Sequence, residues 1–384
     1  MLVPLPPLEA YRRDIDRMGG RTSFGATDAR WLDAATLLHR FIDAPFHERT
    51  ELATGIAHFL APGIEQTFWR AGLEFAHDIE EAGALHLCYT WLFSLERLVP
   101  DNRAIDDGRV RATRARIARK LGAADLALKL YAEVERLGEQ RAEPELTARA
   151  WIGYAVAASE RGNLPEAQRW YREAALVADD TGCVEQASLA HQGLLISFAV
   201  AGDFNEAIVE GWHAYVSANG NAARQAEILA NVSQALYDMG HHSAALRGFA
   251  AVITQTTQIR VLLPALGGAA MAAAALRRPS VVRAVATRAE ALMSSGWHHP
   301  VAQTLLDLAD AYDRLGDPGA AEPYRARALS IAEAHGLHRL AHRAREGSSR
   351  DESCQTPIEL DRAAGLVVDS IVSLEAPSDL CAIG

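Results

Sequence analysis

Among the residues of this sequence, the histidines come nearest to the spacing of a reactive site. His338 and His342 are four residues apart, so a helix would place them on one face, and His335 lies three residues before His338. A protein zinc site takes three or four ligands in a tetrahedral arrangement. Gly336 interrupts the helix between His335 and the pair, so the three side chains do not form a complete ligand set. We therefore expect no metal site.

Catalytic motifs are missing from the sequence. It contains no HExxH metalloprotease motif, no GxSxG nucleophile turn, no GxxxxGK[ST] phosphate loop and no GxGxxG after a strand. The four cysteines have no CxxC spacing and indicate reduced thiols. These observations predict a protein that is not an enzyme and that uses no cofactor.

Charge and hydropathy narrow the classes of partner. The 384 residues carry a net charge of −11, which disfavours nucleic-acid binding by the chain as a whole. No stretch approaches 18 consecutive apolar residues, and the N-terminus lacks the basic and apolar regions of a secretory signal. We expect a cytoplasmic protein that does not enter a membrane.

The elements that position any binding residues repeat along the chain. A glycine followed five residues later by an alanine recurs every 38 to 40 residues, and one unit is missing between the last two copies, where Arg278 stands at the expected turn. A weaker copy starts at Gly83, with Cys88 in the alanine position. The five clear pairs are Gly122 and Ala127, Gly162 and Ala167, Gly202 and Ala207, Gly240 and Ala245, and Gly316 and Ala321.

Each unit is predicted to be two helices joined at this glycine. Apolar residues at helical spacing precede the turn, and helix-start residues follow it. Asn163 and Asp203 are each followed three residues later by a glutamate, as in a capping box, and Asp317 precedes a proline at the first helical position. The glycine permits a tight turn with positive φ, and the alanine lets two helices approach closely.

These residues resemble the tetratricopeptide repeat family. The pattern in the clearest unit is Trp151, Ala155, Gly162, Leu164, Ala167, Tyr171 and Ala174, and in the last unit it is Leu305, Leu308, Ala309, Tyr312, Gly316, Ala321 and Ala328. The resemblance covers residues 105–340 well, although the period exceeds the family's 34 residues and residues 179–182 replace the closing proline. It implies an all-α fold, a right-handed superhelical α-solenoid of antiparallel helix pairs. The long period is similar to that of repeat arrays in bacterial signalling proteins.

Four regions follow from these patterns. Residues 1–27 form an N-terminal arm, and residues 28–104 form irregular helical hairpins, with helices expected over 27–41, 48–60, 64–81 and 85–98. Residues 105–346 hold the repeats. Residues 347–384 form a linker and an acidic tail helix, which Thr356, Pro357 and Glu359 would start.

The resemblance implies that the first helix of each hairpin lines a concave groove, with residues two, three, six, nine and ten before the turn glycine facing it. The groove is then basic at one end, amide-lined in the middle and acidic at the other, and Ile196 and Val200 also occupy groove positions. Asn231 resembles a peptide-binding asparagine of related receptors. The candidate binding residues are Arg109, Arg116, Arg119, Lys120, Gln192, Asn231, Gln234, Tyr237, Asp307, Asp310 and Asp313.

Three functional hypotheses remain open. In the first, the groove captures a peptide or protein segment and the chain is a bacterial sensor or regulatory adaptor. In the second, the acidic tail folds back and caps or plugs the array. In the third, the basic face of Arg109, Arg116, Arg119 and Lys120 binds a nucleic acid or a phosphorylated ligand. Charged residues at these spacings also occur on helix faces that only meet solvent.

Overall fold

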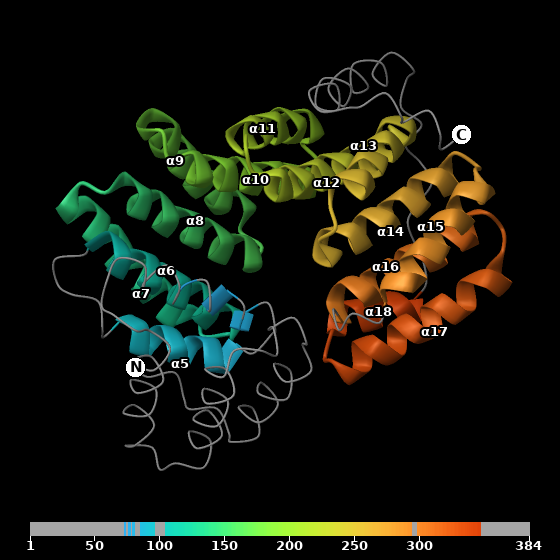
Figure 1. Cartoon of the computed structure of the whole chain (residues 1–384), viewed down its shortest axis with the longest axis horizontal. Helices are drawn as coiled ribbons and strands as arrows, with labels where there is room; N and C mark the ends of the chain where they lie inside the picture. The colour runs from blue at the N-terminus through green and yellow to red at the C-terminus, as the bar shows by residue number, and fades with distance from the viewer. Residues whose placement is uncertain are drawn as a thin grey trace, which may run out of the picture. The chain divides into compact units, whose positions relative to one another are not determined.

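The computed structural model describes residues 85–96, 104–293 and 298–346, together with Leu73, Ala76, His77, Ile79 and Glu80. Within these ranges it holds fourteen helices and no strand (Figure 1). The predicted arm, the first two predicted helices and the predicted tail helix lie outside the described residues. The helices are α5 (Leu85–Glu96), α6 (Ala104–Lys120), α7 (Ala124–Arg141), α8 (Pro144–Glu160), α9 (Leu164–Thr181), α10 (Val184–Ala201), α11 (Phe204–Ser217), α12 (Ala222–Asp238), α13 (His242–Gln255), α14 (Ile259–Ala275), α15 (Pro279–Leu292), α16 (His298–Arg314), α17 (Pro318–Ala334) and α18 (His338–Glu346).

The helices form two compact units, which divide after Gln186. Within each unit a helix packs against the next one in the chain, and Figure 1 shows pairs such as α16 and α17 running side by side. The first helices of successive pairs also touch: α6 contacts α8, α12 contacts α14, and α14 contacts α16. This is the arrangement of an all-α solenoid, so the predicted fold class is confirmed. No described helix is both long enough and apolar enough to cross a membrane.

The turn glycines of the five clear pairs adopt the left-handed conformation that favours glycine, and Gly83 lies outside the described residues. Their φ angles are 79° at Gly122, 78° at Gly162, 87° at Gly202, 87° at Gly240 and 81° at Gly316. The turn of the repeat that lacks a glycine lies one residue earlier than predicted, because Arg277 and not Arg278 takes the positive φ, at 55°. The period read from the sequence is therefore the period of the helix pairs.

Helix capping follows the predicted residues in two cases of three. The Asn163 side chain accepts a hydrogen bond from the Glu166 amide at 3.3 Å and donates to the Glu166 carboxylate at 2.8 Å. The Asn163 backbone N–H donates instead to the Ala158 carbonyl, so the helix is capped but the reciprocal half of a capping box is not formed. The Asp317 carboxylate accepts from the Ala320 amide at 3.1 Å. The expectation for Asp203 was wrong, because it occupies the cap position of α11 but its side chain makes no capping hydrogen bond.

Small residues let the helices approach closely. The five alanines that follow the turn glycines are all fully buried. A methyl group added at Gly153 would lie 2.3 Å from the ring of Tyr131, and one at Gly268 would lie 2.3 Å from the ring of Phe249. Each aromatic ring thus occupies the space that a glycine leaves on the facing helix, which fixes the spacing between neighbouring helices.

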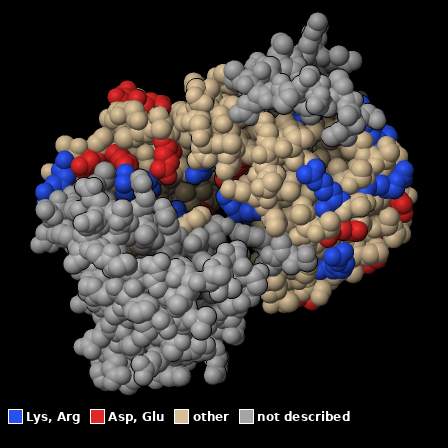
Figure 2. Space-filling model, viewed as in Figure 1, with Lys and Arg blue, Asp and Glu red and all other residues tan. Residues whose placement is uncertain are grey.

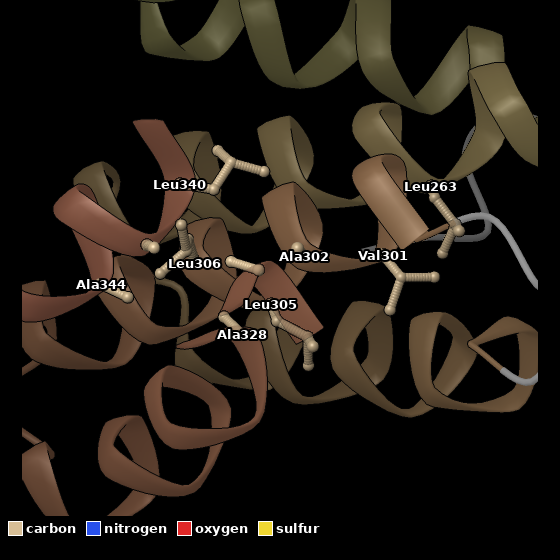
Figure 3. Close-up of a cluster of buried hydrophobic side chains, with 10 residues drawn as sticks. Leu263, Val301, Ala302, Leu305, Leu306, Ala328, Leu340 and Ala344 are labelled. Atoms are coloured by element: carbon tan, nitrogen blue, oxygen red, sulfur yellow. The ribbon is translucent and has the colours of Figure 1, made fainter. Parts of the chain in front are cut away.

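The C-terminal helices share one apolar core. Leucine, valine and alanine side chains from α14, α16, α17 and α18 meet there, as Figure 3 shows for Leu305, Leu306 and Leu340. Leu340, Ala341 and Ala344 lie on one face of α18 and are all buried. The short helix α18 therefore packs against α16 and α17 in the position of the first helix of a further pair.

Candidate binding face

The predicted basic residues on α6 are all paired with carboxylates. Arg109 holds Glu145 through two hydrogen bonds, of 2.8 Å from Nε and 2.6 Å from Nη2. Glu80 accepts from Arg116 at 2.6 Å and from Lys120 at 2.8 Å. Arg119 forms an ion pair with Glu160. The basic end predicted from the sequence is therefore a row of internal ion pairs.

These pairs join neighbouring repeats. Arg109 on α6 binds Glu145 on α8, and Arg149 on α8 in turn binds Glu185 at the start of α10, at 3.2 Å. In both pairs the two residues are 36 positions apart, close to one repeat. Burial opposes ionisation of Glu145, but the hydrogen bonds from Arg109 and the charges of Arg149 and Arg109 outweigh it, so the pKa of Glu145 lies below its ordinary value.

The predicted acidic residues of α16 are also paired. Arg343 of α18 donates to Asp307 at 2.8 Å and to Asp310 at 2.6 Å, and Arg325 of α17 holds Asp313. Burial raises the pKa of the Asp307 carboxyl even though Arg343 opposes that shift. The acidic end of the groove therefore holds α18 in place, and we correct its interpretation as an open negative surface.

The amide side chains in the middle of the predicted groove are only partly paired. The Gln192 carbonyl on α10 accepts from Arg224 on α12 at 3.2 Å, which links these two first helices. Gln234 is half-buried and donates to Asp238 at 3.0 Å. Asn231 is also half-buried, and its amide has no hydrogen-bond partner among the described residues.

Tyr237 does not face an open groove as predicted. Its side chain is 6% exposed, and its hydroxyl accepts a hydrogen bond of 2.8 Å from Nη1 of Arg314. The ring also lies under the Arg314 guanidinium, 5.9 Å from its carbon. Tyr237 thus links α12 directly to α16. Both of these helices also contact α14, which lies between them in the chain.

Two apolar residues complete this middle section. Ile196 is 47% exposed and Val200 is 69% exposed, both on α10. Ile196 and Gln234 stand six residues before their turn glycines, and Val200 and Asp238 stand two residues before theirs, so the repeat register places each pair at matching positions of α10 and α12. In Figure 2 the visible surface over α11 and α12 is mostly uncharged. Gln192 is only 6% exposed, so this predicted residue does not lie open for binding. We name Ile196, Val200, Asn231 and Gln234 the α10–α12 face.

Sequence reasoning selected the polar members of this face and not the exposed apolar ones. It also missed Arg343 and Arg277. The signal for Arg277 was available, because one repeat lacks the turn glycine that the others possess. Among the described residues, no group of three or more His, Cys, Asp and Glu side chains could hold a metal ion.

Comparison with known proteins adds little to this description. No protein-family model matches the chain, and no curated protein matches it. Among solved structures, the chain is similar to the crystal structure of BtubC (BKLC) from P. vanneervenii, with a TM-score of 0.38 and 16% sequence identity. That match covers 76% of this chain and 95% of the other. So low a similarity gives no basis for transferring a function.

Proposed function

We propose that the chain is a non-enzymatic scaffold, similar to tetratricopeptide repeats, that binds an extended peptide or protein segment on the α10–α12 face. The observation that supports this is the exposure of Ile196 and Val200 on a first helix, with the half-buried amides of Asn231 and Gln234 on the first helix of the next repeat. We further propose that it works as a regulatory adaptor or sensor in the bacterial cytoplasm.

The chemistry of this face suits an extended polypeptide. A side-chain amide donates and accepts at once, so Asn231 can bind both the N–H and the C=O of a peptide backbone. Ile196 and Val200 would bury apolar side chains of the same segment. Complete burial of such a side chain is worth about 1.5–3 kcal/mol, so the half that remains exposed offers about 1 kcal/mol each.

The internal ion pairs favour this face over the basic one. A nucleic acid or phosphorylated ligand on α6 would have to displace Glu80, Glu145 and Glu160 from their cations. Each exchange would replace one carboxylate by another anion, so the gain in free energy would be small. At the C-terminal end, α18 already covers part of the core that a capping tail would cover.

The test is a pull-down from native lysate with the full chain. We expect Ile196→Asp combined with Val200→Asp to abolish capture of the partner, and Asn231→Ala to weaken it by about tenfold. Val209→Asp combined with Val216→Asp is the matched control, because these residues of α11 are 55% and 49% exposed but belong to a second helix. Equal capture by both double variants, identified by mass spectrometry, would rule out the α10–α12 face.

A further inference from the structure

The turn between α11 and α12 contains an asparagine followed directly by a glycine, Asn219 and Gly220. This turn joins one helix pair to the next, and Asn219, Gly220 and Asn221 are all exposed to solvent. In such a sequence the backbone nitrogen of the glycine can attack the side-chain amide of the asparagine, because glycine has no Cβ to hinder the approach. The dipeptide Asn-Gly occurs once in the chain, so this reaction has one favoured place.

The backbone N–H of Gly220 forms no hydrogen bond with a described residue. This distinguishes it from the other glycines of positive φ in the described ranges, each of which donates its N–H to the carbonyl three residues earlier. Those glycines are Gly122, Gly162, Gly182, Gly202, Gly240, Gly316 and Gly336. In the α11–α12 turn the preceding residue makes this hydrogen bond instead, from the Asn219 N–H to the Val216 carbonyl at 3.1 Å. The Gly220 nitrogen is therefore exposed and unbound, although its φ of 83° is that of an ordinary turn glycine.

The side chain of Asn219 also forms no hydrogen bond with a described residue. Asn163 and Asn221, in contrast, each accept a hydrogen bond from the backbone of the helix that they cap, at 3.3 Å and 3.1 Å. Asn205 and Asn231 lie inside α11 and α12, where the next residue carries a side chain. Among these asparagines, Asn219 alone combines an unbound amide with an unbound glycine nitrogen beside it.

We propose that Asn219 is a self-modification site, at which the chain converts an asparagine to isoaspartate without an enzyme. The Gly220 nitrogen bonds to the side-chain carbonyl carbon of Asn219 and loses its proton to water, while the side-chain NH2 group takes up a proton and leaves as ammonia. Water then opens the resulting cyclic succinimide. Opening at the side-chain carbonyl gives aspartate. Opening at the backbone carbonyl breaks the original peptide bond and gives isoaspartate, in which the main chain runs through the former side chain.

Isoaspartate at position 219 would alter the turn itself. The Asn221 N–H donates to the Ala218 carbonyl at 2.9 Å, and this hydrogen bond closes a loop that contains Asn219 and Gly220. The extra main-chain carbon falls inside that loop, so we expect the hydrogen bond to break. The new carboxylate stands near the N-terminus of α12, where the helix dipole favours a negative charge. The modification should therefore loosen the joint between two helix pairs and leave the helices folded, and it does not depend on binding at the α10–α12 face.

The test is incubation of the purified full chain at mildly alkaline pH, followed by peptide mapping with mass spectrometry. Conversion replaces an NH2 group by an OH group and so raises the mass of the peptide, and electron-transfer fragmentation distinguishes isoaspartate from aspartate. We expect both products at position 219. Hydrogen exchange should become faster between Ala218 and Asn221 and at the start of α12. The controls within the chain, whose amides should persist, are Asn163, Asn205, Asn221 and Asn231.

The rate of conversion shows whether the folded chain presents the site. The same incubation in guanidinium chloride gives the rate of the unfolded chain. We expect the folded chain to react at most about tenfold more slowly, since its reacting atoms are exposed and unbound. If the fold held these atoms apart, the site would react only when the chain opens, at least about a thousandfold more slowly. Protection of that size would overturn the proposal.

Two variants and a control identify the attacking group. Gly220→Ala should slow conversion at least about tenfold by hindering the attack, and a Cβ there would meet no atom within 4 Å. Asn219→Gln should lose the reaction, because its longer side chain would have to close a larger ring. Gly182→Ala is the matched control, since it places alanine at a φ of 70° in the turn between α9 and α10 and should leave conversion at position 219 unchanged. Equal rates in Gly220→Ala and the original chain would show that the Gly220 nitrogen does not attack Asn219, and no self-modification site would then exist.

Discussion

At the scale of single residues, the main finding concerns the partners of the charged side chains. The residues that looked most available for binding on α6 and α16 are neutralised by carboxylates or arginines, most of them about one repeat away and one, Arg325 with Asp313, within the same helix pair. The contact between Arg343 and two aspartates is poorly solvated, since the Asp310 side chain is only 7% exposed and the Asp307 side chain 15%. Such residues stabilise the fold, and their substitution should be read first as a change in stability.

Arg343→Ala should destabilise the protein. It leaves Asp307 and Asp310 facing each other without a cation in a poorly solvated place, and we expect a loss of about 2 kcal/mol, below the value for a fully buried pair because Arg343 is 28% exposed. Urea unfolding measures the change. Arg345 lies on α18 like Arg343 but forms an exposed pair with Glu333 of α17, so Arg345→Ala should cost less than about 1 kcal/mol. Equal losses would mean that the two aspartates gain nothing from Arg343.

Glu145→Gln should show a dependence on pH with a defined sign. A carboxyl whose pKa is lowered on folding stabilises the protein above its unfolded pKa, near 4.5, and this contribution is lost as the pH falls through the folded pKa. We therefore expect the variant to be less stable by about 1 kcal/mol at neutral pH, and the difference to shrink as the pH falls below about 4. Urea unfolding over this range measures it. Glu322→Gln, at an exposed pair with Arg325, is the control and should cost less than about 0.5 kcal/mol at neutral pH.

At the scale of elements, the turns carry the information that the sequence expresses most directly. A positive φ at the end of a helix restricts the residue type strongly, and close packing of two helices restricts the facing residue to alanine or glycine. Both restrictions are local, so the glycine and the alanine five residues later predicted the helix pairs correctly. The turn at Arg277 was placed one residue late because no glycine marks it.

Gly162→Ala and Ala142→Gly should have opposite effects. Both positions have a positive φ, 78° and 54°, and a Cβ at Gly162 would meet no atom within 4 Å. The only cost of Gly162→Ala is therefore backbone strain, about 1 kcal/mol. Ala142→Gly should gain up to about 0.5 kcal/mol, since relief of strain exceeds the entropy that glycine loses on folding. The urea midpoints of the two variants measure these changes in stability. A Gly162→Ala variant as stable as the original chain would contradict the assignment of this turn.

The site was less predictable than the fold for a physical reason. Which residues face the groove follows from helical periodicity, but whether they remain available depends on a residue about one repeat away. Glu145 stands 36 positions after Arg109, and Glu80 stands 36 positions before Arg116, so a comparison of the sequence with itself at this spacing would have found both pairs. The repeat register did place Ile196 and Val200 at groove positions, but they were not selected as binding residues, because apolar residues at helical spacing usually indicate core.

At the scale of the whole molecule, the division into two compact units determines how far the destabilising effect of a substitution extends. In a repeat array each pair of helices contacts only its neighbours, so stability is a sum of local terms. Ion pairs such as those of Arg343 and Glu145 lie in different units and should act independently.

Hydrogen exchange followed by mass spectrometry can test this independence. Arg343→Ala should speed exchange in α16, α17 and α18 and leave α6 to α8 unchanged, and Glu145→Gln should do the reverse. The cause is the limited reach of nearest-neighbour contacts. Uniformly faster exchange in both variants would show that the chain unfolds as one cooperative body.

The ion pairs between first helices have one more consequence, for how such an array can evolve. Arg109 and Arg149 both stand 13 residues before their turn glycines, and Glu145 and Glu185 both stand 17 residues before theirs. A duplicated copy of the α8 repeat would therefore again place an arginine opposite a carboxylate. This part of the array can gain such a repeat without leaving a charge unpaired, and the shared glycines and alanines would keep the spacing of the helices.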